Sequence, residues 1–187
     1  DELNGETLFV DNLVESDSRV VRYTVKDPSQ DNTKELTEAV KQVYRNAVKS
    51  DGKTLVVIDE AHRIITKGES IHQEGVQAVS SLIRETRDRN VAATVVTQNA
   101  DEFTRSNEGR NILRNIDCNL FFNQRDVSSE ISKFFKLSEK EERTLLKLRT
   151  GNTVGFSEAL LHGVENTFIH VEADDQEHQI IEGREEI

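Results

Sequence analysis

Two short runs of apolar, mostly β-branched residues constrain the fold of this chain more than any other feature. The first runs from Thr54 to Ile58, the second lies within residues 91–98, and an amphipathic helical pattern separates them. Such short unbroken runs are typical of strands covered on both faces. Strand, helix and strand together predict a βαβ unit, in which right-handed crossover makes the two strands parallel. The sequence therefore predicts an α/β fold.

Polar residues follow both predicted strands at the same end. Asp59 and Glu60 come after the first strand, and Thr97 and Gln98 close the second. Ligands of open α/β sheets bind where the carboxyl ends of parallel strands meet. In nucleotide-hydrolysing sites one acid there supports Mg²⁺, a second polarises the attacking water, and a glutamine amide binds the γ-phosphate or that water. A strand that stops at a solvated acidic turn explains the first run alone equally well, but two strands ending this way favour a site.

Three segments carry a resemblance to a known family. Residues 56–62, 84–87 and 95–98 read Val-Val-Ile-Asp-Glu-Ala-His, Arg-Glu-Thr-Arg and Val-Val-Thr-Gln. They resemble the HerA/FtsK superfamily of motor ATPases, and most of all the VirB/TraC ATPases of conjugative type IV secretion. The resemblance implies a three-layer, RecA-like P-loop NTPase fold with a mostly parallel sheet, a small helical hairpin insertion and a C-terminal β-hairpin.

The resemblance also implies roles for individual residues. Asp59 and Glu60 would form the Walker B motif, with Asp59 holding Mg²⁺ through water and Glu60 as catalytic base. The Thr97–Gln98 end would sense the γ-phosphate of ATP. Arg87, or as second choice Arg84, would be the arginine finger that reaches a neighbouring subunit's nucleotide. Arginines near a helix C-terminus also complement the helix dipole, so a purely structural role stays open.

One motif of that family is missing from the sequence. No Gly-x-x-x-x-Gly-Lys-Ser/Thr occurs in the 187 residues, and the nine glycines stand singly. Without the backbone amides and lysine of such a loop, little holds the β- and γ-phosphates. We therefore interpret the chain as the later part of a motor domain that lacks Walker A, and we expect it not to hydrolyse ATP by itself.

The charge balance limits contact with nucleic acid to a local segment. The chain has 35 acidic and 24 basic residues and a net charge of −11, which repels phosphate backbones in general. Arg105, Arg110 and Arg114 form the best local basic patch, and loops after such strands can face the channel of a ring motor. A solvated loop and helix paired with nearby acids explains these arginines at least as well.

Composition limits where the protein can reside and which covalent or metal cross-links it can form. A chain of 187 residues with 35% hydrophobic residues can build one sizeable core, and no apolar run approaches the roughly 20 residues of a membrane span, so we expect no transmembrane helix or signal peptide. The single cysteine, Cys118, fits a reducing compartment, and we expect it to be buried in a strand. The histidines lack the spacing of zinc ligands.

The expected organisation has three parts: an acidic N-terminal segment over residues 1–18 that is either an edge strand or a tail, a partial ATPase domain over 19–173, and an acidic tail over 174–187. Within the domain we expect a strand at 19–25, a helix at 33–49 capped by Thr33, no clear pattern at 65–74 and the crossover helix after it. Further on, we expect a helical hairpin at 128–149 with a Ser138–Glu141 capping box and strands at 154–161 and 167–171.

Together these observations indicate part of an ATP-driven motor for DNA or protein transfer in conjugation or type IV secretion. The resemblance implies a hexameric ring, ATP and Mg²⁺ as cofactors, and a cytoplasmic location at a membrane secretion apparatus. Two alternatives stay open: a HerA-type DNA-processing translocase, and a non-catalytic subunit that serves as an assembly or docking module.

Overall fold

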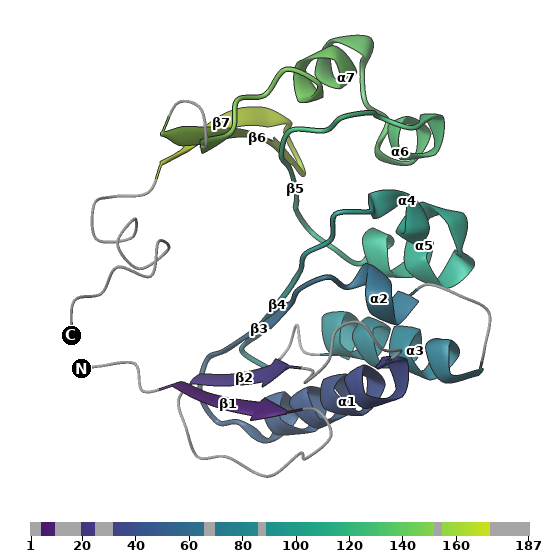
Figure 1. Ribbon diagram of the computed structural model, residues 1–187, viewed down its shortest axis with the longest axis vertical. Coiled ribbons are helices and arrows are strands. Elements are labelled where there is room, and N and C mark those ends of the chain that lie inside the picture. The colour runs from purple at the N-terminus through teal and green to yellow at the C-terminus, as the bar shows by residue number, and fades with distance from the viewer. Residues whose placement is uncertain are drawn as a thin grey trace. The chain divides into compact units, whose positions relative to one another are not determined.

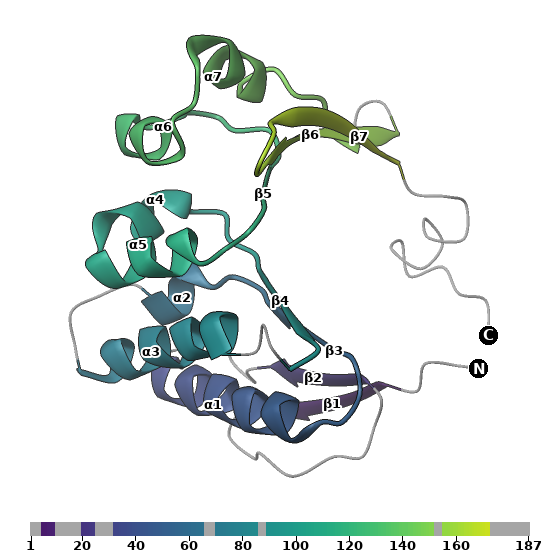
Figure 2. The same cartoon turned by 180° about the vertical axis from the view of Figure 1, so that it is seen from behind.

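The computed structural model describes residues 5–9, 20–24, 32–65, 70–85, 89–151 and 155–172. The chain forms two compact units, residues 1–115 and residues 116–187 (Figures 1 and 2). Parallel strand pairs with helices make up the first unit, and an antiparallel sheet with two short helices makes up the second. The predicted α/β class with a C-terminal β-hairpin is therefore confirmed. The predicted boundaries near residues 18 and 173 border ranges outside the described residues and stay predictions.

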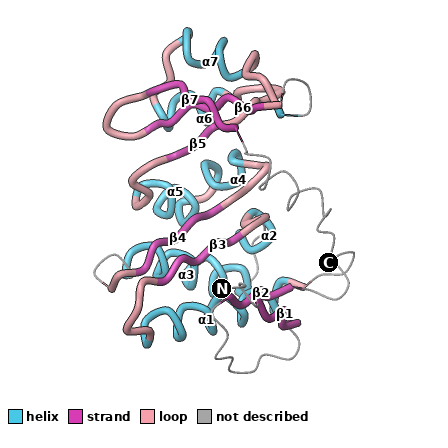
Figure 3. Tube along the Cα trace, turned by 90° about the vertical axis from the view of Figure 1, so that its left-hand side faces the viewer, coloured by secondary structure: helices cyan, strands magenta, loops and turns pink. Residues whose placement is uncertain are grey.

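The first unit contains the predicted βαβ arrangement. Strand β3 (Thr54–Ile58) and strand β4 (Val91–Val95) are parallel, with Thr54 opposite Val91 and Ile58 opposite Val95. Figure 3 shows the two strands side by side. Between them come α2 (His62–Ile65) and the crossover helix α3 (Ser70–Glu85). The other elements of this unit are the parallel pair β1 (Gly5–Phe9) and β2 (Val20–Thr24), α1 (Thr33–Lys49), α4 (Ala100–Arg105) and α5 (Asn107–Arg114).

The expectation that β3 is buried on both faces is wrong for the described residues. Val56 and Ile58 are buried, but the alternate residues Leu55 and Val57 are 66% and 57% exposed. Successive side chains of a strand point to opposite faces. Helices α1 and α3 therefore cover one face of this two-stranded sheet, while the other face carries exposed aliphatic side chains.

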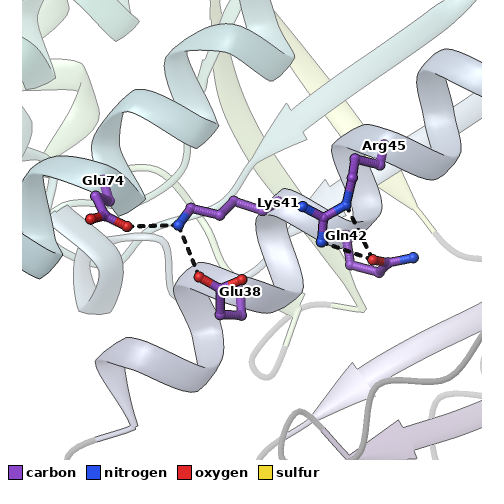
Figure 4. Close-up of polar contacts among 5 residues, drawn as sticks. All are labelled: Glu38, Lys41, Gln42, Arg45 and Glu74. Carbon is purple, nitrogen blue, oxygen red and sulfur yellow. Dashed lines mark hydrogen bonds and ion pairs between the residues drawn. The ribbon is translucent and has the colours of Figure 1, made fainter.

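Helix α1 packs closely against α3 at a glycine. A Cβ atom on Gly75 of α3 would lie 2.7 Å from Ile64 Cγ2 and 2.8 Å from Thr37 Oγ1, so only glycine fits without displacement. On the polar side of the same pair, Lys41 of α1 donates to Glu38 at 2.9 Å and to Glu74 of α3 at 2.7 Å (Figure 4). Packing and charge thus join the two helices on the same side of the sheet.

Two local predictions in this unit need correction. Helix α1 has the predicted bounds, but its N-cap is Asn32 rather than Thr33, and no side-chain hydrogen bond caps it. Residues 65–74 were expected to show no pattern, yet α3 begins at Ser70. Tertiary packing of α3 at Gly75 against α1 and α2 explains a helix start that lacks a sequence signal.

The second unit is an antiparallel sheet in the order β5–β6–β7, with β5 at Asn119–Phe121, β6 at Phe156–His162 and β7 at Thr167–Glu172. Helices α6 (Ser129–Phe135) and α7 (Glu139–Leu145) form the predicted helical hairpin, and the Ser138–Glu141 capping box is present. The rings of Phe121 and Phe135 pack edge to face with centroids 4.8 Å apart, and Leu145 and Leu160 are fully buried.

Cys118 does not occupy the buried strand position expected for it. It is exposed and precedes β5, because the strand begins at Asn119 and is shorter than its apolar sequence suggests. Among the described residues, no helix has the length and apolar character needed to cross a lipid bilayer.

Candidate active site

The candidate site lies at the carboxyl ends of β3 and β4. Hydrogen bonding between the two strands continues past their last residues: Val96 N–H donates to Ile58 O at 2.8 Å, and Ala61 N–H donates to Val96 O at 3.0 Å. These bonds place the segments 59–60 and 97–98 at one edge, as the sequence predicts. The shared edge is a finding of the structure, and the chemical roles of its residues remain predictions.

Glu60 is the centre of the contacts at this edge. Its Oε1 atom accepts a hydrogen bond from Gln98 Nε2 at 2.5 Å. Its Oε2 atom lies 3.1 Å from Nδ1 of His62, in the first turn of α2. That contact has the distance of an ion pair rather than the alignment of a hydrogen bond. The carboxylate therefore lies between an amide and an imidazole.

The backbone of Glu60 is also held in an unusual conformation. Its φ angle is 50°, in the left-handed region, which costs a non-glycine residue roughly 1–2 kcal/mol. Asp59 Oδ1 accepts a hydrogen bond from the Glu60 N–H at 2.8 Å. A residue in this strained conformation at a strand end is often part of a functional site. The turn aims the Glu60 side chain at Gln98 across 38 positions of sequence.

Asp59 and Thr97 play different parts in this turn region. The Asp59 side chain is exposed, and Thr97 Oγ1 accepts a hydrogen bond from the Asn99 N–H at 3.1 Å. Carboxylate oxygen suits Mg²⁺, which keeps most of its waters when proteins bind it. No group of three possible metal ligands occurs among the described residues. Asp59 therefore offers an exposed carboxylate at this edge, and its part in holding Mg²⁺ remains a prediction.

Arg84, the second-choice finger, is not brought to this edge. Arg84 lies in the last turn of α3, the end that leads into the start of β4, and its guanidinium is 3.4 Å from Glu85. Tyr44, near the end of α1, donates to Glu85 at 2.5 Å. This helix end therefore lies toward the starts of the strands, whereas Glu60 follows the end of β3. Arg87 lies outside the described residues.

The basic segment after β4 is largely helical, which agrees with the second of the two interpretations of the sequence, a loop and helix. Arg105 ends α4, and Arg110 and Arg114 lie on α5. The Arg110 guanidinium is occupied by hydrogen bonds within the first unit, because it donates to Thr104 O at 2.8 Å and to Asn107 Oδ1 at 2.9 Å. Arg114 contacts Asn111 at 3.4 Å, and the side chains of Arg105 and Arg114 are exposed.

Sequence reasoning did not assign a role to His62, although the residue stands in the quoted Asp-Glu-Ala-His segment. The sequence feature that could have identified His62 is its position two residues after Glu60, at the start of a helix. A short tight turn followed by a helix brings such a side chain back toward the strand end. The left-handed conformation that makes this turn is not visible in the sequence, because glutamate rarely adopts it.

Comparison with known proteins agrees with this geometry. No curated protein matches the chain. A solved structure, VirB4 of Thermoanaerobacter pseudethanolicus, superposes with a TM-score of 0.69 at 23% identity, over 89% of this chain and 45% of that one. The two therefore share a fold, and this chain spans less than half of that VirB4 chain. The profile of the ATPase family associated with various cellular activities (AAA) matches residues 4–119, which include β3, β4 and the edge between them. This match covers more than half of the 187 residues of the chain, so the chain belongs to that ATPase family.

Proposed function

We propose that the chain is the Walker B and sensor part of a VirB4-like motor ATPase that hydrolyses ATP to drive DNA or protein transfer in conjugation or type IV secretion. The observation that carries this proposal is the contact between Glu60 and Gln98 at the shared edge of β3 and β4. Membership of the AAA family and the fold shared with VirB4 support it.

In this proposal each residue of the edge has one task. Asp59 holds Mg²⁺ through water, Glu60 is the general base that polarises the attacking water, and the Thr97–Gln98 end senses the γ-phosphate. A general base must lie within about 2.6–3.2 Å of the atom whose proton it takes. Glu60 is suited to this task because its backbone and its carboxylate are both fixed. ATP bound at this edge supplies the phosphoryl group, and Mg²⁺ neutralises its charge.

The position of Arg84 favours a site completed by a second subunit. Arg84 belongs to the opposite edge of the sheet from Glu60, so it does not serve the Glu60 of its own chain. An arginine there can reach nucleotide only across a subunit interface, as in a ring. Arg87, the first-choice finger, lies outside the described residues and is proposed on the resemblance alone. We therefore propose a hexameric assembly in the cytoplasm, attached to a secretion complex.

The helices after β4 offer the best place for nucleic acid. Arg105 and Arg114 are exposed and can bind phosphates, whereas Arg110 is already bound within the unit. Phosphate contacts of this kind are independent of base sequence and weaken with salt. We propose them as the weak DNA contact of the motor.

Mg²⁺-dependent ATP hydrolysis by the full-length gene product tests the proposal. Asp59→Asn keeps an oxygen for the Glu60 N–H but removes the charge, so the Mg²⁺ concentration for half-maximal rate should rise about tenfold or more. Asp51→Asn, at the opposite end of β3, is the matched control and should leave that concentration unchanged. DNA should stimulate the rate.

A full-length product that neither binds nor hydrolyses ATP would contradict the motor proposal. It would favour the second candidate, a non-catalytic docking module, and so would the absence of a phosphate-loop motif from the full-length gene product.

A further inference from the structure

The Glu60 carboxylate has a nitrogen-bearing side chain beside each of its oxygens, one in a hydrogen bond and one at ion-pair distance. Gln98 Nε2 donates to Oε1 at 2.5 Å, and His62 Nδ1 lies 3.1 Å from Oε2. Gln98 follows β4, and His62 begins α2, so the two side chains come from different elements. The side chains of His62 and Glu60 are 27% and 35% exposed, so solvent screens this contact only in part.

Such holding matters because a glutamate side chain is flexible. Fixing a long polar side chain costs up to about 1.5–2 kcal/mol in rotamer freedom. Displacement of a catalytic base by about 1 Å from its productive position can lower the reaction rate on the order of 10²-fold. Contacts that already fix the side chain in the nucleotide-free protein mean that this rotamer entropy is lost on folding and not during the reaction. The strained backbone of Glu60 and its bond to Asp59 fix the other end of the same side chain.

We propose that His62 and Gln98 are positioning residues that hold the Glu60 carboxylate from both sides, and that Gln98 acts on hydrolysis through Glu60 rather than by touching phosphate. This inference rests on the proposed function and deepens it. Gln98 has two N–H donors, and Glu60 takes one of them. Its influence on the γ-phosphate then passes through the base and the water that the base polarises.

The contact itself is tested in the 187-residue chain by the side-chain amide resonances of Gln98 in ¹⁵N spectra. Glu60→Ala should move both amide protons toward the positions of a solvated glutamine. The matched control is Gln42, whose amide donates to Asn46 on α1 and should not move. Gln98 resonances that stay in place in Glu60→Ala would overturn the inference, whatever the ATPase activity.

Kinetics of the full-length gene product test the positioning role. Gln98→Leu and His62→Leu should each lower kcat about tenfold, while the affinity for a non-hydrolysable ATP analogue stays within about twofold. In a Glu60→Gln background neither change should lower the residual rate further.

Two results would overturn the positioning role. The first is a Gln98→Leu variant that binds the ATP analogue more weakly but ADP normally, since that pattern indicates direct contact with the γ-phosphate. The second is a loss in Gln98→Leu that adds fully to the loss in Glu60→Gln. A gene product without any ATPase activity would instead refute the proposed function, and the Gln98 resonances alone would then decide the inference.

Discussion

The capping box and the Arg149–Glu158 pair of the second unit are local contacts, whereas the candidate site of the first unit joins distant segments. In the second unit, the N-cap residue Ser138 bonds with Glu141 three positions later, and Arg149 binds Glu158 nine positions later. In the first unit, Glu60 meets Gln98 across 38 positions, and Gly75 packs against Thr37. Local sequence therefore specifies the capping box and the β6–β7 hairpin of the second unit, whereas its β5–β6 pairing and the candidate site form only when distant segments meet.

The largest effect on stability is expected where distant elements meet. Gly75→Ala would press a methyl group onto Ile64 and Thr37, and overpacking of this kind costs about 1–3 kcal/mol. Gly52→Ala is the matched control, because its nearest contact is 3.8 Å away and its cost should be small. Urea unfolding followed by circular dichroism measures both. Equal stability of the two variants would show that the α1–α3 contact is looser than described.

A smaller effect is expected from a local device in the second unit. Ser138→Ala removes a side chain that accepts from the Glu141 N–H at 3.3 Å, while the Glu141 carboxylate accepts from the Ser138 N–H at 2.7 Å. Loss of an N-cap costs about 1 kcal/mol. Ser138→Asp keeps an acceptor and should retain most of the stability. If Ser138→Ala unfolds at the same urea concentration as the natural chain, the capping box contributes nothing.

The smallest effect is a pH dependence that belongs to the second unit. Arg149 donates to the Glu158 carboxylate from its guanidinium at 2.7 Å and its backbone N–H at 2.8 Å, and these bonds lower the pKa of Glu158 to about 2. A lowered pKa stabilises the folded state above the ordinary glutamate range. This contribution should vanish as pH falls from 4.5 toward 2.

Glu158→Gln should lack that component and unfold with a flatter acid profile. Because the pair is exposed, 0.5 M salt should also weaken it in the natural chain, as expected for a surface ion pair. An unchanged acid profile in Glu158→Gln would assign the pH dependence to other carboxylates.

What the sequence predicts depends on whether a feature is set by local pattern or by tertiary packing, in both units alike. Helix α1, the capping box and the β6–β7 hairpin follow from local patterns and are confirmed. The parallel pairing of β3 and β4 also follows from pattern, because crossover geometry leaves few choices. The start of α3 at Ser70 and the exposure of Cys118 do not, since tertiary packing and strand length decide them.

The candidate site was predictable in its place but not in its contacts. Two strand ends with polar residues identify the edge, and the structure brings Glu60 and Gln98 into contact there. The left-handed turn at Glu60 and the approach of His62 depend on how α2 follows the strand, which no local pattern reveals. The roles of these residues stay predictions.

The most direct test of the account compares one carboxylate from each unit. Glu60→Gln and Glu158→Gln are introduced separately into the full-length gene product, and DNA-stimulated ATP hydrolysis and the unfolding midpoint are measured for both. We predict that Glu60→Gln loses hydrolysis by ~10² or more, as expected for a catalytic base, with little change in stability. Glu158→Gln should keep its rate and lose some stability. A Glu60→Gln variant that hydrolyses ATP at the natural rate would contradict the account.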